Sequence, residues 1–70
     1  MKTLKQLRQE KFKKQVDFAM ALDVSKSTVC EWESGKREPN VQQILRIAEV
    51  LNISRYTVLD IIAANKNDQQ

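Results

Sequence analysis

Hydrogen-bonding and cationic side chains that suit a nucleic acid are concentrated between residues 15 and 39. Lys26 is the kind of side chain that binds guanine O6 and N7, and Glu31 is the kind that accepts a hydrogen bond from cytosine N4. Gln15 and Ser25 each stand at the start of a predicted helix, where unpaired N–H groups favour a phosphate. The pattern therefore indicates contacts with both base edges and the phosphate backbone.

Two short predicted helices, over residues 15–22 and 26–34, position these side chains. A tight turn at Asp23, Val24 and Ser25 connects them, and two helices that cross steeply at such a turn form a helix-turn-helix unit. The second helix of such a unit can enter the major groove of DNA. Val29 and Trp32 have the i, i+3 spacing of a core-facing stripe, which leaves the start of this helix to project outward.

The rest of the chain is also predicted to be helical, because Gly35 and Pro39 are its only glycine and proline. We predict an all-α fold with one core and helices over residues 3–11, 15–22, 26–34, 41–51 and 55–63. Residues 1–64 form the predicted domain, and residues 65–70 form a flexible polar tail without periodicity.

The predicted helix starts carry capping residues at every position but one. Thr3 with Gln6 and Asn40 with Gln43 have the spacing of a capping box. The exception is the helix over residues 15–22, which follows Phe12-Lys13-Lys14. Without a capping hydroxyl its first turn is expected to be weaker by about 1 kcal/mol.

The residue inventory argues against catalysis. The chain has no histidine, no glycine-rich loop and no nucleophile beside an evident base, so we expect no enzymatic activity. Cys30 is the single cysteine, which excludes an internal disulfide, and we interpret it as a plain small residue rather than a redox switch. We expect no metal and no other cofactor.

Positive charge is unevenly distributed along the chain. The net charge is +3, but residues 1–37 contain nine basic against five acidic side chains, and residues 38–70 three against four. This asymmetry is expected if one face of the molecule meets phosphates, although surplus lysine is also common on solvated helices.

The length of 70 residues is enough for one small domain. No apolar run approaches the roughly 20 residues that span a bilayer, and the N-terminus lacks a signal-peptide pattern. We therefore expect no membrane association and a cytoplasmic location, in a bacterial nucleoid or the cytoplasm of a host cell.

With these residues in order, the chain resembles the phage-repressor and Cro family of helix-turn-helix DNA-binding domains. The resemblance covers residues 3–62 and rests on Leu4–Arg8, Gln15, Ala19, Leu22, Val24-Ser25, Ser27–Val29, Trp32–Pro39 and Ala48–Ser54. It implies a compact five-helix lambda-repressor-like domain. It also implies a sequence-specific regulator from a phage or mobile element that binds double-stranded DNA as a homodimer on a pseudo-palindromic operator, either as a short Cro-type protein or as the N-terminal fragment of a longer repressor.

The resemblance assigns roles to individual residues. It implies that Lys26, Ser27 and Glu31 contact bases, and that Arg8 and Glu33 form a semi-buried ion pair. It implies phosphate contacts by Gln15, Ser25, Thr28, Ser34, Lys36 and Arg37, to which we add Lys13 and Lys14 as the best placed of the N-terminal lysines.

The surface of the predicted helix 15–22 departs from the family pattern. Val16 and Met20 are i, i+4 neighbours and form a small apolar stripe where relatives carry polar residues. One interpretation is scattered surface hydrophobes, and the other is a patch that binds a protein partner. The second supports an alternative function, a modulator or antitoxin that pairs with another repressor or a toxin.

A dimer is expected because the predicted recognition helix has only one base, Lys26, against Glu31 and Glu33. With so little positive charge, a monomer should bind DNA poorly. Tyr56 and Ile61, on the last predicted helix, are the candidates for the dimer surface. The sequence does not specify the operator, the host, the dimer geometry or the direction of regulation.

Overall fold

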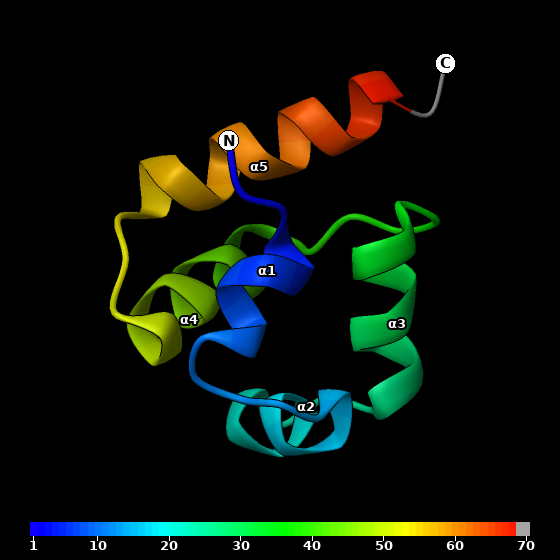
Figure 1. Cartoon of the computed structure of the whole chain (residues 1–70), viewed down its shortest axis with the longest axis vertical. Coiled ribbons are helices and arrows are strands. Elements are labelled where there is room, and N and C mark those ends of the chain that lie inside the picture. The colour runs from blue at the N-terminus through cyan, green and yellow to red at the C-terminus, as the bar shows by residue number, and fades with distance from the viewer. Residues whose placement is uncertain (69–70) are drawn as a thin grey trace.

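The computed structural model describes residues 1–68 of the chain, and the side chains of residues 1–65. Its helices are α1 (Leu4–Gln9), α2 (Gln15–Leu22), α3 (Lys26–Ser34), α4 (Val41–Leu51) and α5 (Arg55–Asp68) (Figure 1). No strand occurs among the described residues. The predicted all-α, five-helix fold is confirmed, and α2, α3 and α4 have the predicted bounds.

The first helix is shorter than predicted. Thr3 is its N-cap and accepts from the Gln6 backbone N–H at 3.1 Å, in the predicted capping box. The helix ends at Gln9, and the N–H groups of Glu10 and Lys11 bond the carbonyls of Leu7 and Arg8, three residues back, in a tightened last turn. The Phe12 ring packs against Phe18 with 5.5 Å between ring centroids, so the chain folds under α2 instead of continuing the helix.

The last helix is longer than predicted. Residues 65–68, which the pattern assigned to a non-helical tail, continue α5, and this part of the prediction was wrong. Ala63 and Ala64 favour a helix, and the Asn65 side-chain amide donates to the Trp32 carbonyl at 3.2 Å. Residues 69–70 of the predicted tail lie outside the described residues.

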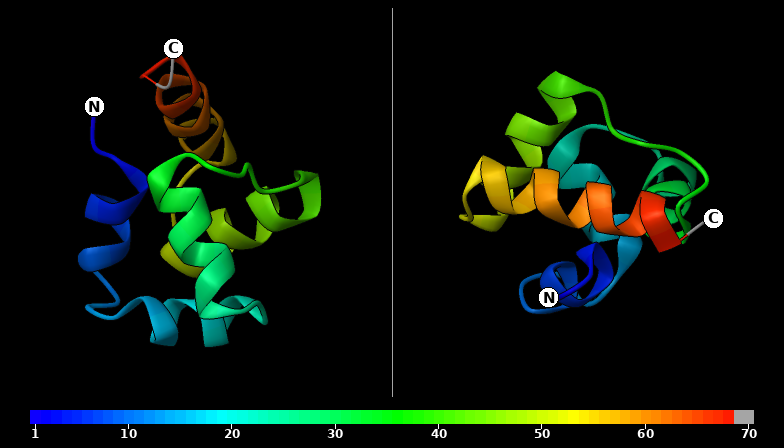
Figure 2. Two further views of the ribbon diagram at one scale, coloured as in Figure 1. Left: turned by 90° about the vertical axis from the view of Figure 1, so that its right-hand side faces the viewer. Right: turned by 90° about the horizontal axis from the view of Figure 1, so that it is seen from above.

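The helices surround one apolar core. α2 and α5 lie at opposite ends of the molecule, with α1, α3 and α4 between them (Figure 2). Every helix contributes buried side chains: Leu4, Phe18, Ala19, Leu22, Val29, Trp32, Ile47, Ala48, Leu51, Val58 and Ile61. The predicted core positions Val29 and Trp32 are confirmed, so α3 has one face fixed in the interior and the other free.

Three helices end in a left-handed residue. Asp23 follows α2 with φ 58°, Gly35 follows α3 with φ 81°, and Asn52 follows α4 with φ 56°. Glycine adopts this region without a Cβ penalty, and Asp and Asn tolerate it better than most residues do. The left-handed Asp23 lies in the turn after which α3 runs steeply across the direction of α2 (Figure 1).

Candidate nucleic-acid interface

The start of α3 is organised by Ser25. Its hydroxyl accepts from the backbone N–H of Thr28 at 3.1 Å and lies 2.9 Å from the Thr28 hydroxyl. This is the predicted N-cap, and it satisfies one of the N–H groups that a helix start leaves unpaired. Ser25 and Thr28, both predicted phosphate contacts, therefore lie together at the positive end of the helix dipole.

The outer face of α3 carries the predicted base-contacting residues. Lys26 and Ser27 are exposed and Glu31 is half-buried. Together with Gln15 from α2 and with Cys30, they line one shallow hollow on the surface. The structure thus brings residues from two helices to a single surface, as a reader of the major groove requires.

Cys30 in this hollow was not anticipated as a site residue. Its side chain is a free thiol on the exposed face. The signal was present in the spacing, since Cys30 follows Lys26 by four residues and therefore shares its face of the helix.

A buried ion pair lies beneath this surface. Arg8 Nε and Glu33 Oε2 are 2.6 Å apart, and the two side chains are 3% and 5% exposed. The predicted pair is therefore present and is almost fully buried. The Gln15 side-chain amide also donates to Glu33 Oε1 at 2.9 Å. One carboxylate thus connects α1, α2 and α3, and it fixes the direction of a predicted phosphate contact.

Arg8 also makes hydrogen bonds to the backbone before α2, which the sequence did not indicate. Its Nη1 donates to the carbonyls of Phe12 and Lys13, at 2.9 and 2.8 Å. The N-cap of α2 is Lys14, whose side chain makes no capping hydrogen bond, as the missing hydroxyl predicted. The guanidinium therefore secures the segment before α2 in place of a cap. Lys13 and Lys14 remain exposed directly before the start of α2.

A second group of predicted phosphate contacts follows α3. Lys36 and Arg37 are exposed directly after Gly35, and the Ser34 hydroxyl donates to the Glu31 carbonyl at 3.2 Å. Arg37 Nε lies 3.9 Å from Glu31 Oε1, in a pair that is largely open to solvent. Such exposed pairs contribute little, so Arg37 and Glu31 remain accessible to another partner.

Of the residues predicted to contact another protein, Val16, Met20 and Tyr56 are exposed and Ile61 is buried. Val16 and Met20 are 42% and 73% exposed on α2, so the apolar stripe is present. Tyr56 on α5 is also exposed. Ile61 is only 4% exposed and belongs to the core, so its predicted place in a dimer surface was wrong. Helical period explains the difference, because Ile61 shares the inward face of α5 with Val58.

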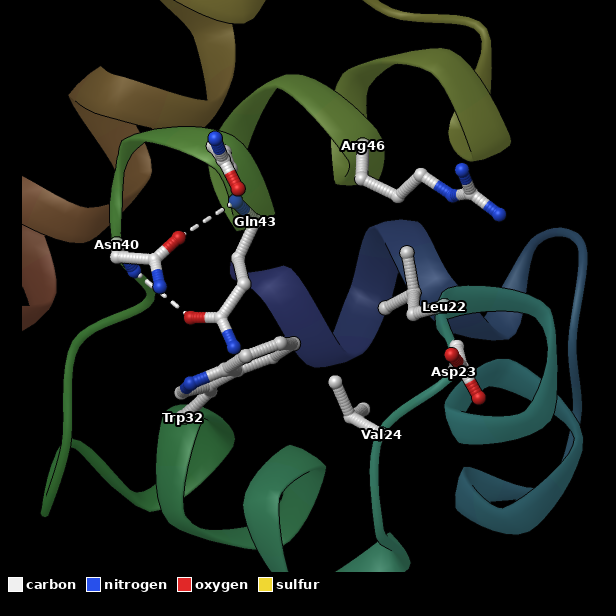
Figure 3. A pocket seen from close by; sticks show the side chains of 8 residues that line it. Leu22, Asp23, Val24, Trp32, Asn40, Gln43 and Arg46 are labelled. Carbon is white, nitrogen blue, oxygen red and sulfur yellow. Dashed lines mark hydrogen bonds between the residues drawn. The ribbon is translucent and has the colours of Figure 1, made fainter.

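A cavity lies between the α2–α3 turn and α4 (Figure 3). Its walls include Asn40 and Gln43, which bond each other reciprocally at 2.8 Å, and the guanidinium of Arg46. The indole of Trp32 forms another wall, and its Nε1 has no hydrogen-bond partner among the described residues. The polar part of the lining includes these amides, the Arg46 guanidinium and the Asp23 carboxylate.

Comparison with known proteins decides the family. A helix-turn-helix family model, HTH_3, matches residues 4–57, which is most of the chain and contains α1 to α4 and the whole surface described above. The chain belongs to this helix-turn-helix family. The resemblance to Cro and C1-type repressors is thereby confirmed, and the protein is a DNA-binding transcriptional regulator of a family that is normally non-enzymatic.

Other comparisons add no relative. Neither the curated proteins nor the solved structures contain a match to this chain. Within residues 1–68, no helix is long and apolar enough to cross a membrane.

Proposed function

We propose that this helix-turn-helix protein is a sequence-specific regulator of the Cro and repressor type, from a phage or mobile element, that places α3 in the major groove of a pseudo-palindromic operator. The observation that carries the proposal is the shared hollow of Gln15, Lys26, Ser27 and Glu31. Each good bidentate contact of such residues with a base discriminates by roughly 1–3 kcal/mol.

Exposed cations before α2 and after α3 support this placement. Lys13 and Lys14 are exposed beside the start of α2, and Lys36 and Arg37 are exposed after the end of α3. These cations supply the electrostatic attraction that α3 itself lacks, since Glu31 offsets Lys26. They also fix the orientation of α3 without reading sequence.

Dimerisation follows from the weak charge of one recognition helix. Two copies bound one helical turn apart would double the contacts, and exposed Tyr56 on α5 is the residue that we place at their interface. A regulator of this kind acts where DNA is, in the bacterial nucleoid or the cytoplasm of a host cell.

Selection from random duplex DNA at near-physiological salt tests the proposal. The purified chain should enrich a pseudo-palindrome, and Lys26→Ala should lose that preference. Lys5→Ala is the matched control, because Lys5 is an exposed lysine on α1 and should leave the enriched sequence unchanged. Enrichment of no sequence by the unaltered chain would contradict the proposal.

The alternative function, a modulator or antitoxin that binds another repressor or a toxin, draws its support from Val16 and Met20. Both are exposed on α2, and Met20 is the more exposed of the two. Under this alternative Met20→Glu should abolish capture of the partner while duplex selection stays unchanged. Under the leading proposal, Gln15→Ala and Lys26→Ala are the damaging changes.

A further inference from the structure

The segment between α1 and α2 is attached to a distant helix end. The Lys11 ammonium donates to the Val50 carbonyl at 2.6 Å, across 39 positions of the chain. Figure 1 shows this segment, in blue after α1, beside the end of α4. No pattern in the sequence distinguishes Lys11 from the other solvated lysines.

Val50 offers a suitable acceptor, because the last carbonyls of a helix have no partner within it and lie at its negative end. The N–H of Asn52 bonds the Glu49 carbonyl at 3.2 Å, and that of Ile53 bonds the Ala48 carbonyl at 2.9 Å. These backbone N–H groups thus donate to the two carbonyls that precede Val50 in α4, and the Lys11 ammonium donates to the Val50 carbonyl.

The same segment is held from its inner side as well. The Lys11 ammonium lies 5.9 Å from the centre of the Phe12 ring, which packs on buried Phe18. Arg8 binds the carbonyls of Phe12 and Lys13 from within. Two cations therefore fix the segment that leads into Lys13 and Lys14, one from the core and one from the surface.

We propose that Lys11 is a positioning residue for DNA binding, which holds the phosphate-contacting Lys13 and Lys14 in place by docking on the end of α4. This inference rests on the proposed function. The end of α4 leads directly into the start of α5, where Tyr56 is exposed. Lys11 thereby sets the position of the phosphate contacts relative to the proposed dimer surface.

The experiment measures DNA affinity at several salt concentrations for Lys11→Met, which keeps the aliphatic stem and removes the ammonium. The duplex is the one that the unaltered chain selects. We expect Kd to rise about three- to tenfold, the value of a charge-assisted hydrogen bond reduced by its exposure. Lys11→Arg should restore most of the affinity, and Lys5→Met, an equal loss of charge on α1, should change it little.

The salt dependence separates positioning from direct contact. If Lys11 acts only by positioning Lys13 and Lys14, Lys11→Met should leave the slope of log K against log salt unchanged in a Lys13→Gln/Lys14→Gln background. A further fall of about 0.9 in that background would show that Lys11 neutralises a phosphate itself and would overturn the inference. An unchanged Kd in Lys11→Met would overturn it too.

A double-mutant cycle provides the second criterion. In a Lys13→Gln/Lys14→Gln background, Lys11→Met should have no further effect on Kd, whereas the same loss in both backgrounds contradicts positioning. If Lys11→Met does not fold, Lys11→Gln is used for both measurements. A wild-type chain that binds no duplex would refute the proposed function, and this inference with it.

Discussion

At the scale of single residues, Glu33 supports the candidate interface from beneath its surface, with a side chain that is almost fully buried. Its carboxylate accepts from Arg8 on α1 and from Gln15 on α2. Breaking a buried ion pair costs far more than the pair itself contributes, because the remaining charge stays desolvated. Glu33 thus sets both the stability of the helix packing and the orientation of the Gln15 amide.

Glu33→Gln should therefore reduce the free energy of unfolding by about 3 kcal/mol, since buried Arg8 loses its counter-charge. Urea unfolding followed by circular dichroism measures the change. Glu31→Gln is the matched control, because Glu31 has only a partly exposed partner at 3.9 Å, and its effect should stay within about 0.5 kcal/mol. Equal losses in the two variants would contradict the role given to Glu33.

The resemblance to known repressors predicted the Arg8–Glu33 pair, but not the other bonds of these side chains. The hydrogen bonds from Arg8 to Phe12 and Lys13 end on backbone carbonyls, which every residue type possesses. A bond of this kind leaves no pattern in the sequence. The same reason explains why the contact of Lys11 with Val50 was not predicted.

At the scale of helices, starts were easier to predict than ends. Thr3, Ser25 and Asn40 cap three helices as predicted, because a capping side chain must be one of a few types at a fixed spacing. The end of α5 was missed because its support is the tertiary bond from Asn65 to the Trp32 carbonyl. The helical period places Ile61 with Val58 on the inner face of α5, whereas a place in a dimer surface would require its side chain to be exposed.

The cap of α3 can be separated from its recognition face by two serine substitutions. Ser25→Ala should lower the free energy of unfolding by about 1 kcal/mol, because it removes the acceptor for the Thr28 N–H. Ser27→Ala should leave stability nearly unchanged and alter the selected DNA sequence instead, since Ser27 is exposed beside Lys26. Thermal unfolding and duplex selection of both variants provide the comparison, and a stability loss confined to Ser27→Ala would refute it.

At the scale of the whole molecule, the apolar core and the charged surface have different roles. The apolar core holds α3 by Val29 and Trp32, while basic side chains before α2 and after α3 face outward. Since the net charge is only +3, attraction to DNA depends on where these cations lie more than on their number.

Lys13→Gln/Lys14→Gln should weaken binding to all duplexes about equally and lower the salt slope by roughly 2, because two phosphate contacts are removed. Titrations at three or more salt concentrations measure the slope. The matched control, Lys2→Gln/Lys5→Gln, removes the same charge at the other end of α1. A change in sequence preference in Lys13→Gln/Lys14→Gln would contradict the assignment to phosphates.

Tyr56→Glu should shift operator binding to higher protein concentration, because it places like charges at the proposed dimer surface. Binding to an isolated half-site should be unaffected. Sedimentation of the protein–DNA complexes gives the stoichiometry directly. Two copies per operator at unchanged affinity would remove Tyr56 from the interface.

The buried indole of Trp32 gives the molecule a built-in optical reporter. It is the only tryptophan and is 2% exposed, on the inner face of α3, the helix that carries the proposed recognition surface. Its emission therefore comes from one buried environment in the folded state and should move to longer wavelength when α3 separates from the core and the indole meets water. The light that the protein emits reports whether the recognition helix is in place.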